Sequence, residues 1–354
     1  MLKAIIIGQG MAGSVLAWEL HRRGQTIAII DDCHRTSSTR VAAGMVNPVQ
    51  GQRLNLAWRI EDCLPAAKAF HQQIAETFGR SFFNETPILR VIDGEAEKNQ
   101  LAKRRDDPRF TPFLGPDQPA DSQHGVNDGD GSLLIHQSGY VETNPLLNCL
   151  TEFFQKENLL HQADFDHDHL QVHADHVAWR DLKAERVIFA EGWRILNNPW
   201  FKDYNFQPNK GEILTIKSDQ PLPANPINRN KWIIPLPDGS AWTGSTYGRG
   251  KTDHEPTEAG RFEILSKVED TLPGHQLRVI GHRAGVRCAT GDHIPRAGLH
   301  PDNPQVAVFN GFGSKGNVFI PWLARQFADF LIDGKPLPEE CDFAARPPKK
   351  KPAK

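Results

Sequence analysis

The sequence predicts an α/β protein in which a Rossmann-like domain is interleaved with a second, α+β domain. Three observations lead to this prediction. A turn with the pattern G-x-G-x-x-G joins a short apolar segment to an amphipathic one near the N-terminus, and a second glycine-rich turn follows the apolar residues 306–309. The third observation is the length of 354 residues, which is too great for one ordinary hydrophobic core, so we expect two packed lobes.

The N-terminal segment has the pattern of a complete βαβ unit. Residues 2–7 have the composition of a buried strand, and the next six residues form the glycine-rich turn, namely Gly8, Gln9, Gly10, Met11, Ala12 and Gly13. Apolar residues then recur at helical spacing as far as a helix stop at Gly24. Residues 26–30 form a second strand, which ends at Asp31 and Asp32. The spacing therefore predicts a dinucleotide-binding unit.

Each glycine of this turn has a physical role in binding a dinucleotide. Gly8 permits the tight turn, Gly10 lets a pyrophosphate approach the backbone, and Gly13 lets the helix pack closely against the strand. The N–H groups and the positive dipole end of the helix then face the phosphates. Asp31 lies where an acidic side chain accepts hydrogen bonds from ribose hydroxyls. The motif alone does not distinguish a nicotinamide from a flavin dinucleotide.

Composition and charge argue against several other classes of protein. Lys plus Arg number 41 and Asp plus Glu number 43, so the formal net charge of −2 gives no overall field that attracts nucleic acid or membranes. The five cysteines are widely spaced and form no C-x-x-C pair, which argues against a disulfide framework or a zinc ribbon and favours a reducing compartment. No segment has the roughly 18 uninterrupted apolar residues of a membrane span, and no signal peptide is evident. We therefore expect a cytoplasmic protein.

Residues 37–48, after the second predicted strand, are largely small and would let the backbone approach a flat ring system. They contain a Thr-x-x-Ala-Ala-Gly sequence that ends at Gly44, and here the chain resembles the D-amino-acid oxidase and glycine oxidase (DAO) family of FAD-dependent oxidoreductases. Further matches to the family follow in the expected order at residues 138–143, 186–193, 210–214, 242–246, 285–295 and 310–317. The resemblance spans the chain from Ile5 to about Ile332.

The resemblance implies a FAD-binding domain of the glutathione-reductase type and FAD held non-covalently. It also implies hydride transfer from a small amine or amino-acid-like substrate to flavin N5, with molecular oxygen as the usual acceptor. Arg287 matches the arginine that anchors the substrate carboxylate and fixes its α-carbon, and Thr246 and Tyr247 lie in the matching substrate segment. The alternative for Arg287 is a structural arginine at a strand end. The positions that the resemblance assigns to the cofactor are Gly8, Gly10, Met11, Ala12, Gly13, Asp31, Asp32, Arg40, Ala43, Gly44, Met45, Gly192, Gly311, Gly313, Ser314, Lys315, Gly316 and Asn317.

The order of the matches predicts interleaved domains. The FAD-binding domain takes residues 1–80, 134–200 and 281–335, and the substrate domain takes residues 81–133 and 201–280. Within the substrate domain, residues 115–132 are rich in Gly, Pro, Asp and Asn and predict an exposed loop. Residues 336–354 are predicted to form a flexible basic tail.

Two features suggest other chemistry but have simpler explanations. Five histidines lie among aspartates between residues 161 and 176, a pattern that we interpret as a solvated hairpin, so no metal is expected. Cys288 is offset by one residue from the cysteine that carries a covalent flavin in some relatives, so we interpret it as a free buried thiol.

Two other functions stay open beside the amine oxidase that we favour. Residues 244–250 and 287–293 resemble the oxidase half of the bifunctional enzyme that modifies the wobble uridine of tRNA, although no methyltransferase half is present in these 354 residues. That reading would make tRNA a partner, for which the near-neutral net charge gives no support. The glycine turn alone would also suit an NAD(P)-dependent dehydrogenase. The sequence does not specify which amine is oxidised.

Overall fold

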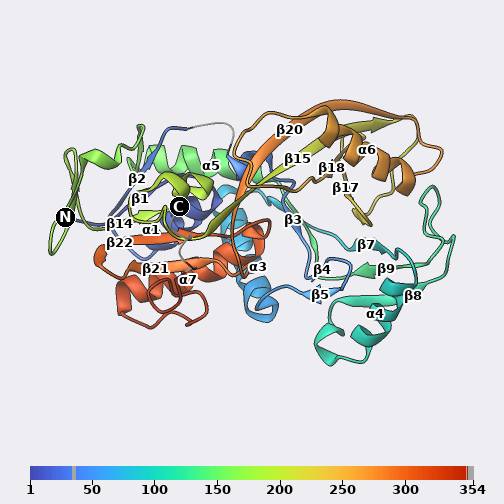
Figure 1. Cartoon of the computed structure of the whole chain (residues 1–354), viewed down its shortest axis with the longest axis horizontal. Helices are drawn as coiled ribbons and strands as arrows, with labels where there is room; N and C mark the ends of the chain where they lie inside the picture. The colour runs from blue at the N-terminus through green and yellow to red at the C-terminus, as the bar shows by residue number, and fades with distance from the viewer. Residues whose placement is uncertain (34–36, 348, 350–354) are drawn as a thin grey trace.

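The computed structural model describes residues 1–33, 37–347 and 349, and two β-sheets dominate it. One sheet lies in the lobe that contains the N-terminus, and the other forms the second lobe (Figure 1). Within the described residues, no helix has both the length and the apolar character that crossing a bilayer requires. The predicted α/β class and the two lobes are confirmed.

The first sheet contains eight strands: β1 (Leu2–Ile7), β2 (Ile27–Asp31), β11 (Leu160–Gln162), β12 (Leu170–Val172), β13 (Val177–Trp179), β14 (Leu182–Phe189), β21 (Arg296–His300) and β22 (Asn303–Asn310). Strands β11, β2, β1, β14 and β22 lie side by side and run parallel. Parallel strands are covered on both faces, which is why β1 and β2 consist almost entirely of buried apolar residues.

The helices of this lobe are α1 (Met11–Arg22), α2 (Ser38–Val41), α3 (Ile60–Phe78), α5 (Thr143–Lys156) and α7 (Gly316–Asp333), with the 3₁₀ turns η2 (His167–His169) and η3 (Gly192–Asn197). Helix α1 starts at Met11, within the G-x-G-x-x-G motif and directly after Gly10, and packs against α5 and α7. It stops before Gly24, whose φ of +73° is the left-handed conformation that ends helices. The predicted βαβ unit is therefore confirmed.

The second sheet contains nine strands: β7 (Ile88–Val91), β8 (Leu114–Gln118), β9 (Ser132–Ile135), β15 (Phe206–Ser218), β16 (Ile227–Asn228), β17 (Trp232–Pro235), β18 (Ser240–Gly244), β19 (Gly248–Arg249) and β20 (Leu277–Thr290). Helices α4 (Glu95–Arg105) and α6 (Glu258–Thr271) and the 3₁₀ turn η1 (Pro108–Phe110) belong to this part of the chain. Two small sheets consist of β3 (Met45–Val46) with β6 (Phe83–Glu85) and β10 (Gly139–Val141), and of β4 (Val49–Gln50) with β5 (Asn55–Leu56).

The two faces of the second sheet have different surroundings: one packs against α6 and the other faces a cavity. On β15, Leu214 and Ile216 point to one face and join a buried cluster with Ile264 and Val268 of α6. Because side chains alternate along a strand, the neighbouring Ile213 points to the other face, where it lines a cavity between the lobes. The long strands β15 and β20 pair along their whole lengths and carry this face toward the first lobe (Figure 1).

Two of the predicted domain boundaries fall inside strands of the second sheet. The boundary at residue 134 lies within β9, and the boundary at residue 281 lies within β20. Their strands pair with β7 and β15 respectively, so we propose to place these boundaries after Ile135 and after Thr290 instead. The division into domains otherwise remains our proposal.

The prediction of an exposed loop at residues 115–132 is wrong in part. Strand β8 takes up its start, and both Val126 and Asp128 are buried. The Asp128 carboxylate accepts hydrogen bonds from the Ser122 hydroxyl at 3.1 Å and from the Gln123 N–H at 3.2 Å. Polar composition indicates an exposed loop only when the polar groups are hydrogen-bonded to water. Here the polar groups of the loop form hydrogen bonds with one another.

The prediction that residues 336–354 form a flexible tail is wrong for its first part. Leu337, Cys341 and Phe343 are buried, and the Phe343 N–H donates to the carbonyl oxygen of Ala297 at 2.8 Å. The basic and proline-rich end dominated the composition and concealed these apolar residues. Residues 348 and 350–354 lie outside the described residues, so the prediction is not tested there.

The packing of this C-terminal segment can be tested at Phe343. Its ring lies 5.2 Å from that of Phe201 and 4.8 Å from that of Tyr204, between ring centroids. We expect Phe343→Leu to lower the free energy of unfolding by about 1–2 kcal/mol, measured by denaturant titration, because it removes these buried contacts. The matched control Phe262→Leu on α6, where the side chain is 75% exposed, should change it by less than about 0.5 kcal/mol. Equal effects of the two changes would mean that the segment does not contribute.

Candidate functional site

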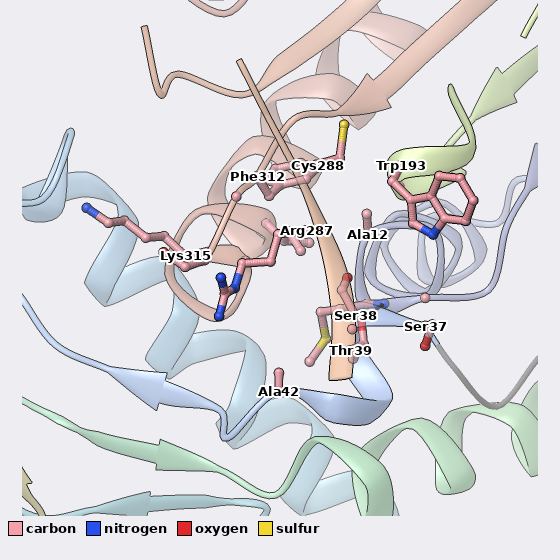
Figure 2. A pocket seen from close by; sticks show the side chains of 18 of the residues that line it. Ala12, Ser37, Ser38, Thr39, Ala42, Trp193, Arg287, Cys288, Phe312 and Lys315 are labelled. Atoms are coloured by element: carbon pink, nitrogen blue, oxygen red, sulfur yellow. Dashed lines mark hydrogen bonds between the residues drawn. The ribbon is translucent and has the colours of Figure 1, made fainter. Parts of the chain in front are cut away.

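A cavity of about 1160 Å³ lies between the two lobes. Small-molecule sites usually span about 300–1,000 Å³, so this volume has room for a dinucleotide together with a small substrate. Most of the predicted site residues line it, from both glycine-rich turns, the end of β2, the loop around Gly44, η3, the segment after β18 and β20: Gly8, Gly10, Met11, Ala12, Asp31, Asp32, Ala43, Gly44, Met45, Gly192, Tyr247, Arg287, Gly313, Ser314, Lys315, Gly316 and Asn317. Figure 2 shows side chains from distant parts of the sequence around this one space.

The first glycine turn forms one end of the cavity. A Cβ at Gly13 would overlap the carbonyl oxygen of Gly8, so this position must be glycine for the turn to pack. A Cβ at Gly10 would meet only the Thr39 hydroxyl oxygen, at 3.6 Å, so Gly10 faces open space. The first turn of α1 carries no acidic side chain, and the Met11 N–H donates to the Thr39 hydroxyl at 3.1 Å. The other N–H groups at this helix start and the helix dipole therefore form a cradle suited to a phosphate group.

The two aspartates after β2 have different partners. The Asp31 carboxylate accepts the N–H of Gln9 at 2.7 Å and the N–H of Cys33 at 2.6 Å, which ties the end of β2 to the glycine turn. Each carboxylate oxygen has a second lone pair, so Asp31 can still accept a ribose hydroxyl. Asp32 forms an ion pair with Arg194 at 2.8 Å, a contact that the sequence did not indicate.

The loop around Gly44 forms a side wall of the cavity. Gly44 has a φ of +75°, and a Cβ there would overlap the carbonyl oxygen of Val141. The Val141 N–H in turn donates to the Gly44 carbonyl oxygen at 3.0 Å, which fixes the loop against β10. Only glycine allows the backbone of this loop to approach both β10 and the cavity.

The second glycine turn leads from β22 into α7 and closes the cavity. The Gly313 N–H donates to the carbonyl oxygen of Cys288 at 2.7 Å, so the turn is attached directly to β20. Lys315 follows in this turn and lines the cavity. Burial lowers the pKa of Lys315 to about 8.

Arg287 lies on the cavity face of β20. Its Nη2 donates to the Ser245 hydroxyl at 2.7 Å, and its Cζ lies 5.1 Å from the centre of the Tyr247 ring. A Cβ at Gly211 would overlap the guanidinium, so this glycine makes room for it. Burial lowers the pKa of Arg287, and among the described residues no carboxylate pairs with it. A partly buried cation that no carboxylate neutralises, open to a cavity, is suited to binding an anion.

Four predicted site residues do not line the cavity. Gly13 packs behind Gly8, and Gly311 packs against the Thr290 methyl group, which a Cβ would approach to 2.9 Å. Thr246, between β18 and β19, holds this connection against β15, because its hydroxyl accepts the Glu212 N–H at 3.0 Å. Arg40 turns away and its guanidinium donates to Asn148 on α5. Direct contact of these residues with a ligand therefore has no support.

Several residues that contact the site were missed by the sequence analysis. Thr39 supports the glycine turn, Ser245 holds Arg287, and Trp193 and Trp232 line the cavity. Thr39 and Ser245 belong to segments that match the family, but only the fold shows what their hydroxyls contact. The histidine-rich stretch contains the hairpin β12–β13, and the described residues hold no group of three or more His, Cys, Asp or Glu side chains arranged for a metal ion.

Comparison with known proteins agrees with this geometry. The family model described as FAD dependent oxidoreductase (DAO) matches residues 3–330. The tRNA 5-methylaminomethyl-2-thiouridine biosynthesis bifunctional protein of Marinobacter nauticus is 27% identical over 92% of this chain, which spans only 54% of that protein. Glycine oxidase from Bacillus licheniformis is 24% identical over 95% of this chain and 94% of its own length. The crystal structure of glycine oxidase from Bacillus cereus superposes with a TM-score of 0.79 at 20% identity, covering 95% of this chain and 96% of that chain.

Proposed function

Because the chain belongs to the DAO family of FAD-dependent oxidoreductases, we propose that it holds FAD non-covalently in the cavity described above and oxidises a small amine or amino-acid-like substrate there. The observation that carries the proposal is that one cavity joins the glycine-rich turn at the start of α1, the glycine-rich turn before α7, and Arg287, with which no carboxylate of the described residues pairs. An NAD(P)-dependent dehydrogenase, the alternative drawn from the glycine motif, is set aside because the family uses FAD.

The cavity residues fit the parts of FAD in order. The cradle at Gly10 suits the pyrophosphate and Asp31 suits the ribose. The loop at Gly44 and the turn at residues 312–316 lie at the cavity walls where a flat ring system would be held. A covalent link through Cys288 is disfavoured, because burial raises the pKa of this thiol to about 12 and keeps it protonated and unreactive.

The chain's own residues supply binding and orientation. Arg287 would grip the substrate carboxylate through two parallel hydrogen bonds and so fix the α-carbon, while Ser245 and the Tyr247 ring hold the guanidinium in place. Bound FAD supplies the hydride acceptor, so the substrate leaves as an imine that water hydrolyses, with molecular oxygen as the proposed final acceptor. No dedicated protein base is needed for this reaction.

The proposal is tested on the purified protein. We expect a yellow protein that releases FAD on denaturation. An anaerobic screen of glycine, N-substituted glycines and other amino acids should find a substrate that bleaches the flavin, with hydrogen peroxide formed when air is admitted. A protein that binds no FAD would contradict the cofactor assignment, and a flavin that no amine bleaches would contradict the substrate class.

A second candidate is oxidation within tRNA wobble-uridine modification, which the similarity to the Marinobacter nauticus protein favours. The chain spans about half the length of that bifunctional protein, so the activity of the whole protein does not transfer to it directly. Binding to tRNA measured at low salt, where phosphate contacts are strongest, tests this candidate. Absence of binding under those conditions would leave the small-molecule oxidase.

A further inference from the structure

The charged side chains that line the cavity differ in whether a neighbour compensates their charge. Asp32 pairs with Arg194, and Asp31 accepts two backbone N–H groups. By contrast, no carboxylate in the described part of the chain pairs with Arg287 or with Lys315. The cavity therefore holds two cations whose charge no carboxylate of the described residues compensates.

These two cations come from different elements, but both lie at the same end of the cavity. Arg287 projects from β20, and Lys315 projects from the turn before α7. Figure 2 shows both side chains extending to one side of the cavity, away from Trp193 and Ser37. Since Ala12 of the first glycine turn lies on the side of Trp193, the two cations face the part of the cavity remote from the phosphate cradle.

Leaving two cations of one cavity partly buried without anions is unfavourable, because each has lost part of its hydration. The depressed pKa of Lys315 has burial as its only cause, which agrees with a missing counterion. One carboxylate can satisfy one of the two cations fully, since a guanidinium binds it through two parallel hydrogen bonds. A second negative charge is then needed for the other cation.

We propose that Arg287 and Lys315 together bind a substrate with two negative charges, an amino or imino dicarboxylate. This inference rests on the proposed oxidase function of the same cavity. The planar guanidinium of Arg287 takes the carboxylate beside the carbon that is oxidised. The compact ammonium of Lys315, on its flexible stem, takes the second carboxylate. Lys315 is then a residue that determines substrate specificity, whereas the family resemblance assigned it to the cofactor.

The test compares two ligands that differ in one group. Iminodiacetate carries two carboxylates, and N-ethylglycine has a methyl group in place of the second one. Binding to the purified FAD-loaded protein is measured by calorimetry and by quenching of tryptophan fluorescence, because Trp58, Trp193 and Trp232 line the cavity. We expect iminodiacetate to bind at least about tenfold more tightly, the effect of one charge-assisted hydrogen bond. Lys315→Met should lower this preference about tenfold, and Lys315→Arg should retain most of it.

The control is Lys335→Met. Lys335 follows the far end of α7, is 61% exposed and pairs with Asp333 at 3.4 Å, so its loss should leave the preference unchanged. The proposal is overturned if the wild-type protein shows no preference, if Lys315→Met keeps the preference, or if Lys315→Met loses FAD. Failure of the proposed function has a different signature. The wild-type protein would still prefer iminodiacetate and Lys315→Met would still lose this preference, yet no amine would bleach the flavin.

Discussion

Gly10→Val is expected to give a folded protein that contains less than about a tenth of the wild-type FAD. The protein's own packing tolerates a side chain here, because a Cβ would meet only the Thr39 hydroxyl oxygen at 3.6 Å. The same side chain would occupy the cradle in which the pyrophosphate approaches the backbone N–H groups. The ratio of flavin to protein absorbance measures cofactor content, and circular dichroism checks that the fold persists.

Substitutions at two further glycines serve as controls for this prediction. Gly129→Val changes an exposed glycine with an ordinary φ, outside the cavity, and should keep its FAD. Gly13→Ala should lose both cofactor and stability, because its Cβ would overlap the Gly8 carbonyl oxygen. If Gly10→Val retained full FAD, the assignment of the first turn to the pyrophosphate would be wrong.

Arg287→Met is expected to leave the protein yellow while lowering kcat/KM for a carboxylate substrate by about 10- to 150-fold. This range corresponds to the loss of about 1.5–3 kcal/mol from hydrogen bonds to a charged group. The loss should appear mainly in KM, since Arg287 holds the carboxylate equally before and during hydride transfer. Anaerobic reduction of the flavin over a range of substrate concentrations separates the two constants.

Arg283→Met provides the matched control on the same strand. The guanidinium of Arg283 packs over the Trp242 ring at 5.5 Å and does not line the cavity. Its replacement should change kcat/KM less than about twofold, since only a packing contact outside the site is lost. Similar losses for both variants would point to a general effect of β20 instead of an anchor at Arg287.

The N-terminal unit and the fold class could be predicted from the sequence because their signals are local. The strand, the turn, the helix and Asp31 lie within the first 31 residues, and each acts through its neighbours. The role of Arg287 came from the family resemblance, and its place in the cavity agrees with it. Lys315 was assigned by the same route to the cofactor, and only the three-dimensional structure shows that no carboxylate of the described residues pairs with it.

Other features could not be predicted because they depend on contacts between distant segments. Arg40 turns away from the cavity because its guanidinium donates to Asn148. This partner lies 108 residues along the chain, so the sequence near Arg40 does not indicate the contact. The hydroxyl of Ser245 meets Arg287 only after β18 and β20 have both paired with β15. The burial of Phe343 likewise requires Phe201 and Tyr204, which the composition of the C-terminal stretch could not indicate.

The attachment of the second glycine turn to β20 has a consequence for how a ligand enters. Arg287 precedes Cys288, whose carbonyl oxygen accepts the Gly313 N–H, so a hinge motion that separated the lobes would have to break this bond. Clamshell opening would therefore cost about 1 kcal/mol for this hydrogen bond alone. The Tyr247 side chain is 64% exposed and packs against the Arg287 guanidinium, and it can change rotamer without moving the backbone. We expect this rotamer change to let the substrate enter the cavity.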